Sequence, residues 1–439
     1  MAFSRHSRTE QLRRRAERMP GARHVRRPAT TSSPEFDLTC FRPHPRAGTV
    51  PVVVIPGGPG LASALLYEPF RRRAAAAGLD VIMVEHRGAG LSRRDRDGHD
   101  LPPAAVTATA AVDDIAAVLE AEGVDTAVVA GSSYGSYLAQ GFGVRHPRRV
   151  AGMVVDSTVL TAQDHVVVRE HARRLLWHGT EPSTAGLARK IRILVERDGH
   201  PVASLGAAAR ILYEFTSDHL LERYLDQLVV GRARGTSRLL ATLGSRELLE
   251  DTPFIMELSL VGRIAFREPD FAPPPDGMIF DPALDMASVA DRFPAFEGEP
   301  FDLPAALPRF HRPVAVLSGD RDLRTPRPVA ERTADLLPDA VLVPVRGMGH
   351  SALDTRPALL RAVLTDVRDG RHHELPARAA ELARLPRGGS SSVWIPRVVR
   401  ASLATDRVRT ILRSDPISRS WPCRDDGIPG ATRQAGQVL

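Results

Sequence analysis

The chain has 439 residues, of which 43% are hydrophobic and 25% charged, a composition typical of a globular protein with ample apolar surface to bury. This length favours one main domain with an insertion or extensions, and neither a membrane-spanning apolar run nor a secretory signal is present, so we expect a cytoplasmic protein without a transmembrane segment. The net charge of +7 lies entirely within residues 1–30, so the rest of the chain gives no indication of a nucleic-acid partner.

Residues 1–47 are predicted to form a basic, disordered tail. Nine arginines fall within the first 30 residues, against only Glu10 and Glu17. Such a run is usually solvated, and the alternative is an arm that binds phosphate or an acidic membrane surface. Lys190 is the only lysine of the chain, which makes arginine the default cation here, and a start at Met19 would remove much of this segment.

Residues 48–160 predict the first part of an α/β core. Short apolar segments followed by helical patterns indicate parallel strands covered by helices on both faces. The expected strands are 52–55, 79–84, 126–130 and 150–155, and the expected helices are 62–77, 104–121 and 134–144.

The alternation of strands and helices stops after Asp156. Residues 161–305 show mainly helical patterns and predict an inserted cap that forms one wall of a pocket and excludes water from it. Strand patterns return at 314–317 and 341–343, so residues 306–370 are expected to complete the core. Residues 371–439 are predicted to be a partly disordered C-terminal extension, and we assign them no function.

The strongest local motif is Gly131-Ser132-Ser133-Tyr134-Gly135, which matches G-x-S-x-G and lies directly between a strand and a helix. This motif places the serine on a strained turn where the backbone approaches closely, so its flanking positions favour residues without a Cβ atom. Ser133 is therefore the predicted nucleophile. Ser132 is the weaker candidate because the glycines flank only Ser133 correctly, and the alternative role is a loop that merely turns the chain.

A serine hydroxyl needs a base to activate it and an acid to orient that base. In this type of fold the acid is expected to follow the serine in the chain and the histidine to come last. Asp322 lies in Gly319-Asp320-Arg321-Asp322-Leu323-Arg324-Thr325-Pro326, at the carboxyl end of the strand at 314–317, where ligand sites of α/β sheets lie. We predict Asp322 as the acid, with Asp320 and Asp156 as rivals and turn capping as the alternative role.

His350 is the predicted base. It lies in Gly347-Met348-Gly349-His350-Ser351, whose glycines suit a tight loop after the strand at 341–345. The remaining histidines lack this context, among them His146, His165, His219 and His311.

An oxyanion hole is expected to contain the backbone N–H of Tyr134 and a second N–H from an early loop. Pro56-Gly57-Gly58-Pro59-Gly60 follows the first buried strand and supplies Gly58, or Gly57, as this donor. A plain Gly/Pro turn is the alternative. Cys40 and Cys423 belong to no Cys/His cluster, so the sequence predicts neither a metal site nor a cofactor.

These motifs together resemble the proline iminopeptidase branch of the α/β-hydrolases and its tripeptidyl aminopeptidase-like relatives. The resemblance spans residues 52–353 and implies the α/β-hydrolase fold, a mostly parallel sheet flanked by helices, with an inserted helical cap. The matching motifs are Gly57-Gly58-Pro59-Gly60, Glu85-His86-Arg87-Gly88-Ala89-Gly90-Leu91-Ser92, the serine turn, Gly319 to Pro326 and Gly349-His350. Pro56 replaces the family's histidine, and Tyr134 follows the serine as in the tripeptidyl aminopeptidase-like relatives.

The resemblance implies an aminopeptidase that removes N-terminal residues from short peptides or aminoacyl amides through an acyl-enzyme, without a cofactor. Cap carboxylates bind the free amino group in that family. The candidates here are Glu247, Glu250, Asp251, Glu257 and Glu268. Two alternatives stay open: an esterase or thioesterase acting on small acyl substrates, and a non-catalytic ligand-binding protein that keeps the pocket.

Overall fold

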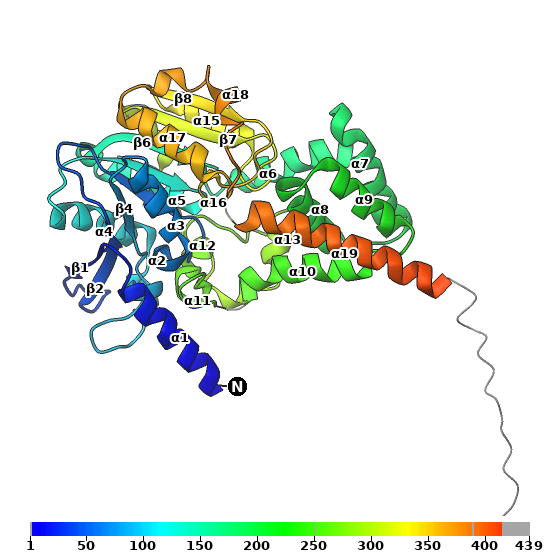
Figure 1. Cartoon of the computed structure of the whole chain (residues 1–439), viewed down its shortest axis with the longest axis horizontal. Helices are drawn as coiled ribbons and strands as arrows, with labels where there is room; N and C mark the ends of the chain where they lie inside the picture. The colour runs from blue at the N-terminus through cyan, green and yellow to red at the C-terminus, as the bar shows by residue number, and fades with distance from the viewer. Residues whose placement is uncertain (1, 250, 389, 415–439) are drawn as a thin grey trace, which may run out of the picture.

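The computed structural model describes residues 2–249, 251–388 and 390–414. Eight strands form one sheet in the order β1-β2-β4-β3-β5-β6-β7-β8 (Figure 1). The pairs β1–β2 and β2–β4 are antiparallel, and all others are parallel. This confirms the predicted α/β class with its mostly parallel sheet. The strands are β1 (Ala22–Arg27), β2 (Phe36–Phe41), β3 (Val52–Ile55), β4 (Val81–Val84), β5 (Ala127–Ser132), β6 (Val150–Asp156), β7 (Val314–Gly319) and β8 (Ala340–Val345).

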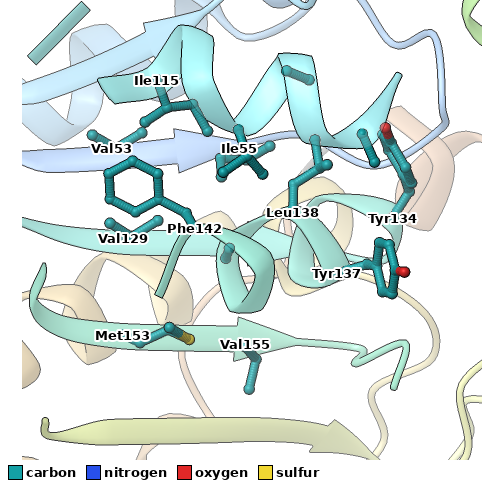
Figure 2. Close-up of a cluster of buried hydrophobic side chains, with 14 of the residues drawn as sticks. Val53, Ile55, Ile115, Val129, Tyr134, Tyr137, Leu138, Phe142, Met153 and Val155 are labelled. Carbon is teal, nitrogen blue, oxygen red and sulfur yellow. The ribbon is translucent and has the colours of Figure 1, made fainter. Parts of the chain in front are cut away.

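Helices cover both faces of the sheet, which is why the central strands are apolar along their whole length. On one face, side chains such as Ile115, Leu138 and Phe142 pack against Val53 and Val129 (Figure 2). The other face is covered by a second apolar cluster. The first face carries α4 (Ala108–Ala121), α5 (Tyr134–Arg145) and α15 (Arg327–Leu336), and the second carries α3 (Glu68–Ala76) and α17 (Pro357–Arg368).

The segment between β6 and β7 is helical and has an apolar core of its own. It lies to one side of the sheet (Figure 1). Its helices are α6 (Asp164–Arg173), α7 (Pro182–Arg192), α8 (Val202–Phe215), α9 (Asp218–Val229), α10 (Arg234–Leu249), α11 (Leu258–Val261), α12 (Arg263–Arg267), α13 (Ala283–Met286) and α14 (Leu303–Ala306). We refer to this segment as the cap.

The prediction of a disordered tail at residues 1–47 is wrong for the described residues. Helix α1 (Ala2–Glu17) comes first, and β1 and β2 extend the sheet beyond β4 (Figure 1). Two arginines of this segment have buried carboxylate partners: Arg42 pairs with Asp80 at 2.7 Å and Arg27 with Asp114 at 2.8 Å. Ion pairing and the burial of β2 therefore order a segment whose composition alone indicates disorder.

The C-terminal extension completes the cap. After α18 (Ala379–Leu382), the long helix α19 (Ser390–Ser414) lies along the cap helices (Figure 1). Its residues Ile395, Val399 and Leu403 belong to the cap core. Asp406 accepts hydrogen bonds from the N–H groups of Gly235 and Thr236 at 3.2 and 2.8 Å, which caps the start of α10. Residues 371–388 and 390–414 thus include ordered helices of an extension predicted to be partly disordered, and the rest of it, with Cys423, lies outside the described residues.

Replacing Leu403 with alanine is expected to lower the free energy of unfolding of the cap by about 2–5 kcal/mol, because its fully buried side chain would leave a cavity. Urea unfolding of the purified protein measures this change. Val393→Ala is the matched control on the same helix, since Val393 is 37% exposed. We expect it to change stability by no more than about 0.5 kcal/mol. Equal effects of the two substitutions would contradict the docking of α19.

None of the helices in the described ranges combines the length and apolarity needed to cross a bilayer.

Candidate active site

Ser133 occupies a strained turn between β5 and α5. Its φ of 55° and ψ of −125° lie outside the regions that ordinary residues prefer. A Cβ at Gly131 would lie 1.9 Å from the carbonyl oxygen of Gly135, and a Cβ at Gly135 would lie 2.2 Å from that of Ile55. Both flanking positions therefore require glycine, and the turn presents the Ser133 side chain at the carboxyl edge of the sheet.

His350 and Asp322 form a buried pair at the same edge. The His350 Nδ1 atom lies 3.1 Å from each carboxylate oxygen of Asp322. The carboxylate also accepts hydrogen bonds from the Arg324 and Thr325 N–H groups, both at 2.9 Å, and from the Thr325 hydroxyl at 2.8 Å. These contacts hold Asp322 in place and orient the ring, so that its Nε2 atom is left available on the opposite side.

Burial and pairing act in opposite directions on the pKa values of this pair. Burial alone would raise the pKa of Asp322. The charge of His350, its hydrogen bond to Asp322 and the hydrogen bond from the Thr325 N–H together lower this pKa to about 2. Burial alone would lower the pKa of His350, but the Asp322 charge and hydrogen bond raise it above its ordinary value. Asp322 is therefore ionised at neutral pH, and it stabilises a proton on His350.

Ser133 and His350 line one large cavity of about 1950 Å³ beneath the cap, together with Gly57 and Gly58. Within the described ranges the Ser133 hydroxyl and the His350 ring share this cavity without a direct hydrogen bond. In enzymes without substrate such contacts are often long and tighten when substrate binds.

The predicted oxyanion loop passes directly beside Ser133. A Cβ added at Gly57 would lie 3.1 Å from the Ser133 Cβ atom and 3.8 Å from its Oγ atom. Tyr134 begins α5, where backbone N–H groups are free to bind a negative charge. Its side chain is buried, and the hydroxyl lies 3.2 Å from His86 Nε2. The structure therefore brings together all five residues predicted for the site: Ser133, His350, Asp322, Gly58 and Tyr134.

The rival residues have structural contacts instead. Ser132 donates to Asp156 at 2.6 Å and lies 2.9 Å from the Ser351 hydroxyl, away from a nucleophile's position. Asp156 also accepts from the Ala352 N–H at 2.7 Å, and burial raises its pKa to about 6. Asp320 accepts from the Gly347 N–H at 2.7 Å and so connects the loop that carries Asp322 to the loop that carries His350.

Three of the cap carboxylates suggested for amine binding, Asp251, Glu257 and Glu268, do not line the cavity. Glu257 accepts from the N–H groups of Phe254 and Gly90 at 2.8 and 3.0 Å. Glu268 accepts from the Ala108 N–H at 2.9 Å. Asp251 binds Ser259 and Arg93, and the side chains of Glu247 and Glu250 lie outside the described residues. These acids that the structure describes stabilise loops rather than line the pocket.

Asp270 was missed by the sequence reasoning. It lies in the Pro-rich loop after α12 and lines the cavity. Its carboxylate has no hydrogen-bond or ion-pair partner among the described residues, and burial raises its pKa. The sequence around it also contains Glu268, Asp276 and Asp281, so the pattern alone does not distinguish Asp270.

Glu214, at the end of α8, is a second residue that the sequence did not indicate. Its carboxylate accepts from the Leu323 N–H at 3.2 Å and pairs with Arg324 at 3.0 Å. Both residues belong to the loop that carries Asp322. A Cβ at Gly349, next to His350, would lie 2.4 Å from the Glu214 carbonyl oxygen. The cap thus touches both loops of the candidate site through one buried residue.

Replacing Glu214 with glutamine is expected to shift the acidic limb of the kcat/KM pH profile to lower pH. The Glu214 charge contributes to the raised pKa of His350, so its removal makes the imidazole easier to deprotonate. The pH dependence of ester or amide hydrolysis measures this shift. Asp218→Asn is the control. It also removes a cap carboxylate, but Asp218 pairs with Arg321 at 2.7 Å and does not contribute to the raised pKa of His350. A limb that stays in place in E214Q, or moves equally in D218N, would contradict this role.

Residues 50–357 match the family described as the alpha/beta hydrolase fold. No curated protein matches the sequence significantly. Among solved structures, the chain is similar to Est816, described as an N-acyl homoserine lactone degrading enzyme, at 21% identity over 78% of this chain and 99% of that one, with a TM-score of 0.43.

Two further structures are similar at the same level. A proline iminopeptidase from Mycobacterium smegmatis is 18% identical over 80% of this chain and 99% of that one, with a TM-score of 0.46. A thermophilic esterase from Thermogutta terrifontis is 18% identical over 80% of this chain and 99% of that one, with a TM-score of 0.42. Similarity at these identities concerns the fold alone.

Proposed function

Because the chain belongs to the alpha/beta hydrolase fold family, we propose that it is a serine hydrolase in which Ser133 is the nucleophile, His350 the base and Asp322 the acid. The observation that supports this most strongly is the His350–Asp322 pair, at 3.1 Å, facing the cavity that the strained Ser133 turn also enters. Chain order and loop position agree with the same roles.

In the proposed mechanism, His350 Nε2 takes the hydroxyl proton as Ser133 Oγ forms a bond to the substrate carbonyl carbon. The N–H groups of Gly58 and Tyr134 bind the oxygen that becomes negative. Asp322 keeps Nδ1 protonated and stabilises the imidazolium. The carbon–leaving group bond then breaks as His350 returns the proton to the leaving nitrogen, oxygen or sulfur. Water repeats the cycle and releases the acid from Ser133.

For the substrate, we propose an aminopeptidase activity on short peptides or aminoacyl amides. Asp270 supports it, because a partly buried carboxylate without a partner on the cavity wall suits the positive charge of a free amino group. Asp270 is not among the carboxylates that the family resemblance suggested, of which Asp251, Glu257 and Glu268 have other partners.

An esterase or thioesterase is the second candidate. It is favoured by the apolar side chains that form much of the cavity wall, such as Val159, Leu205 and Phe266, which suit an acyl chain. A non-catalytic ligand-binding role is the third, and the arranged triad residues count against it.

The experiment that separates these candidates is a panel of aminoacyl p-nitroanilides, p-nitrophenyl esters and acyl thioesters, tested with the wild type and with Ser133→Ala. Aminopeptidase activity predicts hydrolysis of the anilides that requires a free amino group. N-acetylation of the same anilides is the matched control. Hydrolysis of esters alone would favour the second candidate, and activity equal to that of Ser133→Ala on every substrate would contradict a serine hydrolase.

A further inference from the structure

The charges on the cavity wall are unequal. Among the residues that the structure describes, six arginines and four aspartates line the cavity: Arg15, Arg73, Arg210, Arg234, Arg238 and Arg324, with Asp164, Asp270, Asp285 and Asp354. A charge that already has a partner contributes little to ligand binding, so the contacts of each group decide the sign of the field in the cavity.

Most of the aspartates are already engaged. Asp285 pairs with Arg210. Asp164 accepts hydrogen bonds from the N–H groups of Leu160 and Thr161 at 2.7 and 3.2 Å. Asp354 accepts from the Tyr67 hydroxyl at 2.9 Å and from the Ser351 hydroxyl. Of the four aspartates, only Asp270 has a carboxylate without a hydrogen-bond or ion-pair partner among the described residues.

Four of the arginines, by contrast, have no carboxylate partner among the described residues. They are Arg15 on α1, Arg73 on α3, and Arg234 and Arg238 on α10. All four side chains are exposed as well as cavity-lining, so they lie where the cavity opens to solvent. Arg234 and Arg238 are four residues apart and project from one face of α10, although like charges at this spacing destabilise a helix.

Among the described residues, the wall therefore has four positive charges and one negative charge without an oppositely charged partner. We propose that the cavity selects acidic peptides, whose N-terminal amine lies near Asp270 and whose carboxylates, at the C-terminus and on acidic side chains, lie near the arginines at the opening. Guanidinium groups bind carboxylates through paired hydrogen bonds, and an apolar cleft strengthens the attraction. This proposal rests on the proposed hydrolase function and names its substrate class.

Two tetrapeptides of equal length test the proposal: Ala-Ala-Glu-Glu with a free C-terminus, and Ala-Ala-Gln-Gln with an amidated C-terminus. Their binding to Ser133→Ala is measured by calorimetry, and their turnover by the wild type is measured separately. We expect the acidic peptide to bind about tenfold or more tightly than the neutral one at low salt. This preference should shrink as the salt concentration rises to about 0.5 M, because exposed charges are screened.

The arginine variants are tested in the same Ser133→Ala background. Arg234→Ala with Arg238→Ala, and Arg15→Ala with Arg73→Ala, are each expected to bring the two affinities closer together. Arg234→Glu with Arg238→Glu should favour the neutral peptide. Arg72 and Arg232 are exposed neighbours that do not line the cavity, so Arg72→Ala and Arg232→Ala are the matched controls and should keep the full preference.

Equal binding of the two peptides, or a preference that the controls reduce as much as the cavity variants do, would overturn the proposal. So would arginine-dependent binding of coenzyme A thioesters without binding of either peptide, because the anion site would then serve phosphates. Binding of the acidic peptide without turnover by the wild type would support the charge preference and contradict the hydrolase function, so the two failures are distinguishable.

Discussion

Replacing Ser133 with alanine is expected to lower kcat by about 10⁴-fold or more, on whichever substrate of the panel the wild type hydrolyses. The reason is that no acyl-enzyme can form without the Ser133 oxygen, while the oxyanion donors and the cavity wall are left in place. Steady-state kinetics with the purified variant measures the loss, and urea unfolding verifies that the variant is folded.

Ser132→Ala is the matched control, because it removes the neighbouring hydroxyl, which binds Asp156 instead of facing the cavity. A fluorophosphonate probe should label the wild type and Ser132→Ala, and should not label Ser133→Ala. If labelling were lost in Ser132→Ala but kept in Ser133→Ala, the nucleophile would be Ser132, and the proposed mechanism would be wrong.

The second large effect is expected for Asp322→Asn, which should lower kcat by about 10⁴-fold with little change in substrate binding. Asparagine can donate to His350 Nδ1, so it favours the tautomer whose Nε2 atom carries the proton and cannot act as a base. The substitution also removes the charge that raises the pKa of His350.

The pH profile provides the independent readout for this pair. His350 must be neutral to accept the serine proton, and its pKa is raised, so the acidic limb of the wild-type kcat/KM profile should lie above the ordinary histidine value of 6.5. In Asp322→Asn the residual activity should show this limb at lower pH. Asp320→Asn is the control, and near wild-type turnover in Asp322→Asn would show that another group is the acid.

The sheet from β3 to β8 and the loops of the candidate site could be predicted from sequence because each carries a local signal. The strands are short, continuous apolar runs, and the motif around Ser133 can be recognised within five residues, although the Gly135 position is restricted by the distant carbonyl of Ile55. Asp322 and His350 each follow such a strand, so chain order and topology together place them at one edge.

The N-terminal strands and α1 were missed because their stabilising partners lie far away in the chain. Arg27 and Arg42 pair with Asp114 and Asp80, and no local pattern connects these positions. Glu214 was missed for the same reason. At the end of an amphipathic helix a glutamate is usually solvated. Only the tertiary structure reveals that this one contacts the loops that carry Asp322 and His350.

The position of α19 has a consequence for biosynthesis. The apolar core of the cap combines side chains of α6 to α10 with Ile395, Val399 and Leu403, and these last three leave the ribosome well after the sheet has been translated. The strands of the sheet can pair while synthesis continues, whereas the core of the cap stays partly exposed until α19 has been synthesised. The newly made polypeptide thus acquires its folded sheet first and a fully closed pocket last.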